Sequence, residues 1–179
     1  MGNPLIGIIV GSASDLGVAS GAAELLREFG VDFEVGIASA HRTPEDVVCY
    51  AAGAADRGIK VIIAMAGLSA ALPGVVASHT TLPVIGVPIA SGPLSGQDAL
   101  LAIAQMPPGI PVACMGIDGA RNAALMALRI AAICDESLGP KLAEWGRKSA
   151  ESVRRSREKI SEAGDMTPAP ERAFLPNIK

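Results

Sequence analysis

Five short apolar runs, spaced along the chain, constrain its fold more than any other feature. Four of the five are nearly continuous rather than alternating, as in parallel strands covered on both faces. The runs are residues 5–10, 33–38, 61–66, 83–89 and 111–117. Ala/Leu-rich segments with helical spacing separate them. This alternation predicts the α/β class, specifically a flavodoxin-like three-layer α/β/α sandwich with a five-stranded parallel sheet.

The helical segments predict the domain organisation. Four of them are expected over residues 16–29, 44–56, 95–105 and 120–133. A longer helix, about 137–162, has only a narrow apolar stripe and is expected to lie on the surface, solvated or laid as an arm on another subunit. We therefore expect one α/β domain over residues 1–164, with this long C-terminal helix included, and a tail over 165–179 whose three prolines and lack of period favour irregular structure.

The composition indicates which classes of binding partner the chain favours. Charged residues make up 18% of the chain and apolar residues 50%, whereas roughly a quarter of an average soluble domain is charged. Oligomerisation would cover the excess apolar surface. A net charge of -3 and only 3% aromatic residues disfavour a nucleic-acid partner, because phosphate binding and base stacking need basic and aromatic side chains.

The sequence also predicts the cellular compartment and argues against a membrane-spanning segment. Residues 61–97 contain no Lys, Arg, Asp or Glu, but four prolines divide the stretch into pieces too short to cross a bilayer, so we expect no membrane partner. The N-terminus lacks the basic region and cleavage site of a signal peptide. The three cysteines have no metal-ligand or CxxC spacing, so we interpret them as reduced, buried small hydrophobic residues in a cytoplasmic protein.

The loop after the first run reads "GSASD", residues 11–15. In an open parallel sheet, ligands bind at the carboxyl ends of the strands, so the residues that follow each run are the informative ones. Asp15 could cap the next helix through its side chain, and the free N–H groups of that helix N-terminus suit a phosphate. A plain turn with a cap explains the same residues equally well.

The loop after the second run, "SAHRTP", contains one of only two histidines in the chain. Thr43 is a favourable N-cap and Pro44 a favourable first helical residue, which places His41 and Arg42 in the loop at the carboxyl edge of the sheet. A histidine there can act as general acid and base, and an arginine offers a planar fork for phosphate or carboxylate. A hydrogen-bonded loop histidine beside a surface arginine is the alternative.

The remaining loops contribute small residues and few charges. The third, "AGLSAALPG" at 66–74, allows a flat ligand to approach the backbone closely. Asp98, in the fourth, is the only charged residue between Lys60 and Asp118, so an anion would have to be held by Arg42, a helix N-terminus or another subunit. His79 is interpreted as a local cap or interface hydrogen bond.

The motifs that would indicate a cofactor are absent from the sequence. It contains neither a Walker-type phosphate loop nor a Gly-x-Gly-x-x-Gly after the first run. The two histidines lie far apart and have no clustered carboxylates around them, which disfavours a metal site. One loop histidine, small-residue loops and no expected cofactor together indicate proton-transfer chemistry on a small substrate.

Taken together, six loop motifs resemble those of the PurE family of purine biosynthesis. In order, they are "GSASD", "SAHRTP", "AGLSAALPG", "PVIGVP", "LSGQDALL" and "QMPPGIPVACMGID" followed by "NAAL". The resemblance extends from about Ile6 to Ile133. It implies a flavodoxin-like subunit, a homo-octamer, and a small-molecule ribonucleotide substrate, with no metal, biotin or ATP.

The resemblance implies a reaction and a site. In the mutase branch, the carboxylate of N5-carboxyaminoimidazole ribonucleotide moves from the exocyclic nitrogen to ring carbon C4, with His41 as the proton shuttle. Ser12, Asp15 and Arg42 would hold the ribose phosphate, and the loop 67–72 would retain the freed carbon dioxide. The full set of implied substrate-binding residues is Gly11, Ser12, Ser14, Asp15, Ser39, Ala40, Arg42, Gly67, Ser69, Ala70 and Leu72.

One departure from the family pattern leaves a second branch open. Mutases of this family typically read "GGAAHLPG" in the third loop, whereas Ala71 stands here in place of that histidine. The other branch carboxylates aminoimidazole ribonucleotide directly with carbon dioxide and reads more like "GRSNALSG", but Leu68 is not its arginine. Residues 42–44 and 72–74 and the "MPPGIPV" segment favour the mutase. A non-catalytic flavodoxin-like binding module is the remote alternative.

Overall fold

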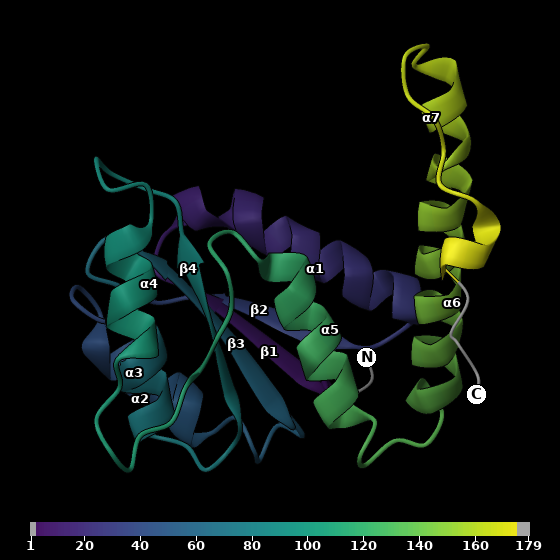
Figure 1. Ribbon diagram of the computed structural model, residues 1–179. Helices are drawn as coiled ribbons and strands as arrows, with labels where there is room; N and C mark the ends of the chain where they lie inside the picture. Colours follow the sequence, from purple (N-terminus) through teal and green to yellow (C-terminus); the bar gives the residue numbers. More distant parts are fainter. Residues whose placement is uncertain (1–2, 175–179) are drawn as a thin grey trace. The chain divides into compact units, whose positions relative to one another are not determined.

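The structure is a computed structural model that describes residues 3–174 (Figure 1). The chain separates after Gly139 into two compact units, residues 1–139 and 140–179. The first contains the whole sheet, and the second contains most of the long helix and the tail. The expected single domain to residue 164 stays a prediction.

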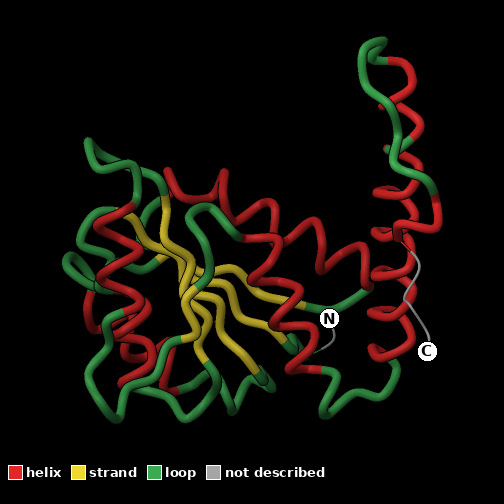
Figure 2. The backbone as a smooth tube through the Cα atoms, viewed as in Figure 1, coloured by secondary structure: helices red, strands yellow, loops and turns green. Residues whose placement is uncertain are grey.

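The first unit is built on a five-stranded parallel sheet, shown as the yellow strands of Figure 2. Its strands are β1 (Ile6–Val10), β2 (Phe33–Ile37), β3 (Val61–Gly67), β4 (Val84–Ile89) and β5 (Ala113–Cys114). Their order is β2-β1-β3-β4-β5. Together with helices on both sides, this order confirms the flavodoxin-like fold.

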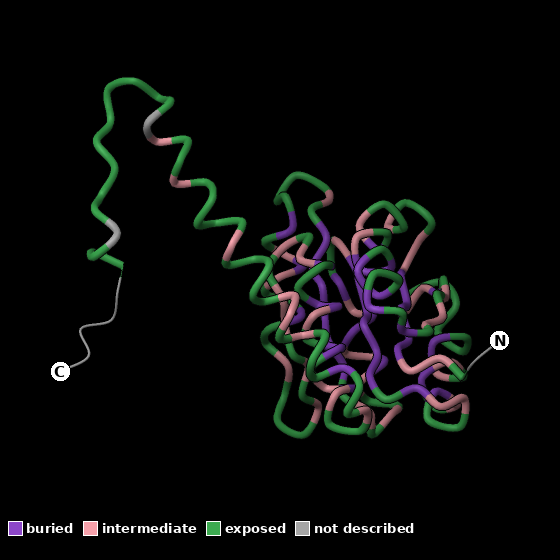
Figure 3. The backbone as a smooth tube through the Cα atoms, turned by 90° about the vertical axis from the view of Figure 1, so that its right-hand side faces the viewer, coloured by how far each residue is buried: buried purple, intermediate pink, exposed green. Residues whose placement is uncertain are grey.

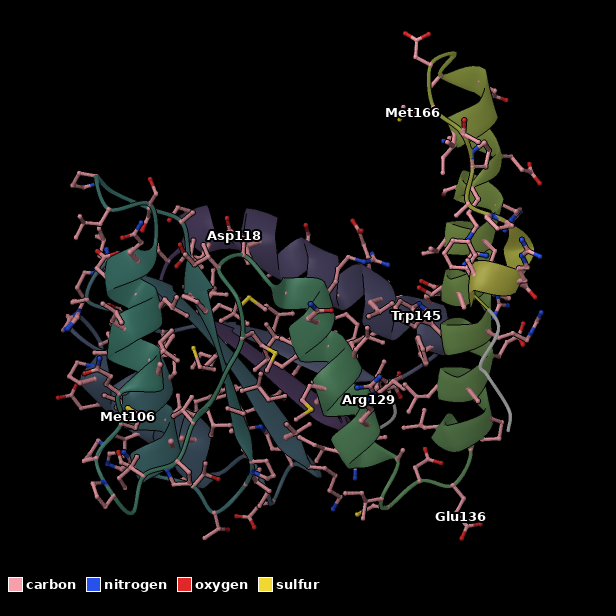
Figure 4. All side chains as sticks on the ribbon, in the orientation of Figure 1. Met106, Asp118, Arg129, Glu136, Trp145 and Met166 are labelled. Atoms are coloured by element: carbon pink, nitrogen blue, oxygen red, sulfur yellow. The ribbon has the colours of Figure 1, made fainter. Side chains whose placement is uncertain are left out.

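Helices cover both faces of this sheet (Figure 1), and Figure 4 shows their side chains in the same orientation. On one face, α1 (Leu16–Phe29) packs against α5 (Ala120–Ala131), and the other face carries α2 (Pro44–Ala52), α3 (Leu72–Ser78) and α4 (Gln97–Ala104). Helix α2 ends at Ala52, four residues before the predicted end. Helix α3 was not among the helical segments predicted from spacing, because it has only seven residues, two of them Pro73 and Gly74.

Strand β5 is shorter than the predicted run of 111–117. Only Ala113 and Cys114 pair in the ladder, although Met115 N–H still donates to the Gly86 carbonyl at 2.9 Å. Pro88 of β4 has no N–H with which to continue the ladder beyond Cys114. Pro111 has no N–H with which to extend the ladder toward the N-terminal side of β5. The prolines in and beside the edge of the sheet therefore limit the strand.

The core lies on the central strands, purple in Figure 3. Strands β1 and β4 are buried along their whole length and β3 along all but its last residue, which explains why their sequences are continuous apolar runs. The helices facing them contribute small side chains that let the layers approach closely. These are Ala19, Ala22 and Ala23 of α1 and Ala120, Ala123, Ala124, Ala127 and Ala131 of α5.

The packing of β2 against α2 positions the loop between them. Arg57 donates to Glu34 Oε1 through Nη2 at 2.8 Å and Nε at 3.1 Å, and Nε also donates to Oε2 at 3.4 Å. Its Nη2 donates to the Tyr50 carbonyl at 3.2 Å as well. Its guanidinium also lies 4.8 Å from the centre of the Tyr50 ring. Burial is the main cause that raises the pKa of the Tyr50 phenol above its ordinary value. These contacts connect strand β2, which precedes the His41 loop, with helix α2, which follows it, and so they hold both ends of that segment in place.

The long helix of the C-terminal part begins as predicted but is interrupted. It consists of α6 (Leu138–Ser156) and, after Arg157, the short α7 (Glu158–Glu162). The Arg157 guanidinium lies over the Phe174 ring, 3.8 Å from its centre. Within the predicted tail, Glu171–Phe174 form a 3-10 turn, and residues 175–179 lie outside the described residues. Over residues 3–174, no helix has both the length and the apolar character needed to span a membrane.

Candidate active site

The loops after β1, β2, β3 and β4 line one cleft of about 310 Å³. Strands β1 and β3 are neighbours, but the chain leaves β1 toward β2 on one side and returns to β3 on the other. This reversal separates the loops that follow β1 and β3, which is where ligands bind in such sheets. The lining residues are Gly11, Ser12, Ser14, Asp15, Ser39, Ala40, His41, Arg42, Ala66, Gly67, Leu68, Ala70, Ala71, Leu72 and Ser91.

The structure brings together every residue of the predicted site except Ser69. Ser69 belongs to the same loop but is exposed and does not line the cleft. Ala66, Leu68, Ala71 and Ser91 line it and were not in the predicted set, although Ala71 had been singled out for the histidine it replaces. Ser91 stands two residues after β4, so applying the strand-end rule to the fourth run would have found it.

His41 stands on a tightly closed turn. The Ser39 carbonyl accepts the N–H groups of Arg42 at 3.3 Å and Thr43 at 2.9 Å, so the chain folds back on itself within five residues. The imidazole is solvent-exposed and lines the cleft. An exposed histidine at this edge of the sheet can exchange protons with a bound ligand and with water.

Thr43 does not cap α2, contrary to the prediction from sequence. It occupies the N-cap position without a side-chain cap bond, and its Oγ1 instead accepts the Ser39 N–H at 3.0 Å. The Thr43 φ of -137° and ψ of 57° accompany this arrangement, in which the hydroxyl bonds back across the turn to Ser39 and makes no bond to the helix N–H groups. The threonine thus closes the loop on which His41 lies.

Arg42 joins the first two loops of the cleft. Its Nη2 donates to the Gly11 carbonyl at 3.2 Å and its Nε to the Ser39 hydroxyl at 3.4 Å. A guanidinium has five N–H donors, so these two bonds fix its orientation and leave other donors for an anion in the cleft. The side chain is exposed, which keeps it accessible to a ligand.

The first loop is organised by its own hydroxyls. Ser12 Oγ accepts the Ser14 N–H at 3.4 Å, and Ser14 Oγ donates to Asp15 Oδ1 at 3.2 Å. The predicted side-chain cap by Asp15 is wrong. Asp15 is the N-cap residue of α1, but its φ of -84° and ψ of -11° are already helical, so its carboxylate does not reach the first N–H groups. That carboxylate faces the cleft instead.

The third loop adopts strained backbone conformations. Leu68 has a φ of 55° and Ala70 a φ of 37°, a region that residues with a Cβ rarely occupy. The Ala70 N–H donates to the Gly67 carbonyl at 3.1 Å, which closes the turn. Residues held in this way cost about 1–3 kcal/mol each and tend to cluster at functional sites.

The second histidine takes no part in the cleft. His79 Nδ1 lies 2.9 Å from both the Ser78 hydroxyl and the Val75 carbonyl, at the end of α3. This confirms the interpretation of His79 as a local hydrogen-bonding residue. In the part of the chain that the structure describes, no three His, Cys, Asp or Glu side chains gather closely enough to hold a metal ion.

Residues 5–152 match the family described as AIR carboxylase, a stretch that spans the sheet and all the loops of the cleft. The chain belongs to the AIR carboxylase family. This confirms the resemblance inferred from the six loop motifs. The family assignment rests on most of the chain and not on the cleft alone.

Curated relatives of this family share about half of their residues with the chain. The N5-carboxyaminoimidazole ribonucleotide mutase of Pyrococcus horikoshii is 53% identical over 161 residues, 90% of this chain and 91% of the relative. That of Methanocaldococcus jannaschii is 54% identical over 88% of this chain and 98% of the relative. The phosphoribosylaminoimidazole carboxylase of Saccharomyces cerevisiae is 49% identical, but the chain spans only 29% of its length.

A solved structure shows the same architecture. The crystal structure of Treponema denticola PurE superposes with a TM-score of 0.78 at 33% sequence identity, covering 88% of this chain and 98% of that one. The family and the fold therefore agree.

Proposed function

We propose that the protein is an N5-carboxyaminoimidazole ribonucleotide mutase of de novo purine biosynthesis, an isomerase that transfers the carboxylate from N5 to C4. The observation that carries this proposal is the cleft itself. One general acid/base, His41, stands beside one cationic anchor, Arg42, in a chain about half identical to relatives of that name. The product is 4-carboxy-5-aminoimidazole ribonucleotide.

His41 carries out the proton transfers. As the N5–carboxylate bond breaks, carbon dioxide leaves and the electron pair stays on the nitrogen, which takes a proton from the imidazolium. C4 then forms a bond to the carbon dioxide, and the neutral imidazole removes the C4 proton. The histidine ends in the protonation state in which it began, so one residue serves both steps.

The first two loops hold the nucleotide. Arg42 and the Ser12 hydroxyl suit the phosphate, because a guanidinium and a hydroxyl both donate to its oxygens. The Asp15 carboxylate can only accept hydrogen bonds when ionised, which suits a ribose hydroxyl. The predicted binding residues from Gly11 to Arg42 would thus anchor the end of the substrate that does not react.

The third loop retains the intermediate. Gly67, Ala70 and Leu72 present apolar surface to the cleft, which neither binds water strongly nor reacts with carbon dioxide. When carbon dioxide stays in the cleft, its bond to C4 forms within the bound complex and does not require a second molecule to diffuse in. This raises the rate of the carboxylation step by a large factor. Because Ser69 does not line the cleft, we do not retain it among the substrate-binding residues.

Ala71 favours a second candidate function, direct carboxylation of 5-aminoimidazole ribonucleotide by carbon dioxide. It lines the cleft at the position where mutases typically have a histidine. Assays of the purified protein with the N5-carboxy compound, and separately with aminoimidazole ribonucleotide and bicarbonate, distinguish the two. Rapid conversion of the first alone establishes the mutase, and rapid conversion of the second alone overturns it.

The substitution His41→Asn is expected to lower mutase turnover by at least about a thousand-fold, because an amide cannot exchange protons at neutral pH and general acid/base catalysis acts in both steps. Turnover is followed by the absorbance of the C4-carboxylated product. His79→Asn is the matched control, since His79 lies at the end of α3 and outside the cleft, and it should retain wild-type turnover. Substantial activity of His41→Asn would contradict the assigned role.

We also propose a homo-octamer in the cytoplasm. The apolar composition and several exposed apolar side chains support self-association. All three cysteines are free thiols, as suits a reducing compartment. Their expected burial is wrong, because Cys49 and Cys134 are exposed and Cys114 is only partly buried.

A further inference from the structure

The third and fourth loops of the cleft interlock through two glycines. A Cβ on Gly67 would overlap the hydroxyl oxygen of Ser91, so the Ser91 side chain lies directly against the end of β3. A Cβ on Gly92 would lie 2.7 Å from Cδ2 of Leu68, so the Leu68 side chain lies against the fourth loop. Each loop therefore accepts a side chain of the other, and Leu68 and Ser91 both line the cleft.

The wall formed by these two loops is almost entirely apolar. Its lining residues are Ala66, Gly67, Leu68, Ala70, Ala71, Leu72 and Ser91. Ser91 is the only one among these described residues whose side chain can donate a hydrogen bond. The other polar side chains of the cleft all come from the first two loops.

The Ser91 hydroxyl differs from the other hydroxyls of the cleft. Those of Ser12, Ser14 and Ser39 each have a partner within the protein. Over residues 3–174, the Ser91 side chain has no hydrogen-bond or electrostatic partner, although the residue is half-buried. A hydroxyl that faces a cleft without an internal partner is available to a ligand.

We infer that Ser91 binds the carboxylate that the reaction transfers; this inference rests on the proposed function. The phosphate is served by Arg42 on the opposite loops, whereas the migrating carboxylate needs a donor on the apolar wall that retains carbon dioxide. A hydrogen bond from a neutral hydroxyl to a carboxylate is stronger than one to neutral carbon dioxide. Ser91 therefore orients the carboxylate in both substrate and product and releases the neutral intermediate between them.

The test compares ligands with and without the carboxylate. Calorimetry on His41→Asn protein, in which conversion is blocked, measures binding of 4-carboxy-5-aminoimidazole ribonucleotide and of 5-aminoimidazole ribonucleotide. Adding Ser91→Ala should weaken binding of the carboxylated nucleotide about ten-fold or more, the usual loss for a hydrogen bond to a charged group. Binding of the nucleotide without the carboxylate should change less than about two-fold, because its contacts do not involve Ser91.

Ser95→Ala is the matched control. Ser95 belongs to the same loop but does not line the cleft, so neither affinity should change. Equal weakening of both ligands by Ser91→Ala would overturn the inference, because it would indicate a general disturbance of the interlocked loops. Failure of the protein with an intact Ser91 to bind either nucleotide would instead contradict the proposed function.

Discussion

At the scale of single residues, the site depends on hydroxyls whose roles are set by backbone geometry. Thr43 has the sequence position of a helix cap, yet its hydroxyl closes the turn from Ser39. Ser91 and Ser95 belong to the same loop, and Ser91, two residues after β4, is the one of the two that lines the cleft. The residue type predicts that a hydrogen bond can form, and the dihedral angles decide with which group.

Thr43→Val is expected to lower mutase kcat/KM by about five- to ten-fold, the usual effect of removing one hydrogen bond. Valine keeps the shape of threonine but leaves the Ser39 N–H without its acceptor, so the turn that carries His41 and Arg42 loosens. Thr43→Ser restores the acceptor and should recover most of the activity. Steady-state kinetics and a thermal melt are measured together. A Thr43→Ser variant as impaired as Thr43→Val would show that the methyl group matters and the hydroxyl does not.

At the scale of secondary-structure elements, local signals decided some boundaries and tertiary contacts decided others. Helix α1 matches its prediction at both ends, because Gly30 ends it in the left-handed conformation, with a φ of 67°. The Val31 N–H then donates to the Leu26 carbonyl at 3.0 Å, as in a Schellman motif. Helix α3 and the short β5 depend more on tertiary contacts. Helix α3 packs on the inner strands β3 and β4, and β5 pairs with β4 at the edge of the sheet.

Gly30→Ala is expected to lower the free energy of unfolding by about 1 kcal/mol, because a Cβ disfavours the left-handed conformation of the helix C-terminus. Gly17→Ala, in the first turn of the same helix, is the control. A Cβ there meets no atom within 4 Å, and the better helix former should raise the free energy of unfolding by about 0.5 kcal/mol. Urea unfolding followed by circular dichroism measures both. Equal effects of the two substitutions would exclude the capping role of Gly30.

At the scale of the whole molecule, edge strand β2 leaves apolar surface uncovered. Glu34 and Gly36 face α2 and its Tyr50 ring, whereas Val35 and Ile37 remain 46% and 54% exposed. Successive residues of a strand point to opposite faces, so these two lie together on the other side. An exposed pair of β-branched residues on an edge strand supports the proposed self-association and is the surface we expect it to use.

Ile37→Lys is therefore expected to shift the protein from an assembly to smaller species, because a buried lysine without a partner destabilises an interface. Sedimentation velocity measures the shift against the mass of one chain, 18.1 kDa. Thr81→Lys, at another exposed residue, should leave the assembly unchanged. A wild-type protein that sediments as a single chain would contradict the proposed octamer, and an unchanged Ile37→Lys assembly would place the interface elsewhere.

The sequence by itself determined the layered fold and the position of the His41–Arg42 loop, because apolar runs, helical spacing and strand-end loops are local features. Only the tertiary structure decided which loops meet. The strand order brings Ser91 of the fourth loop against Gly67 of the third. Leu68 and Ala70 adopt left-handed conformations in a loop of which Ser69 does not line the cleft. These outcomes depend on contacts between residues far apart in the chain and on individual dihedral angles, neither of which a local pattern contains.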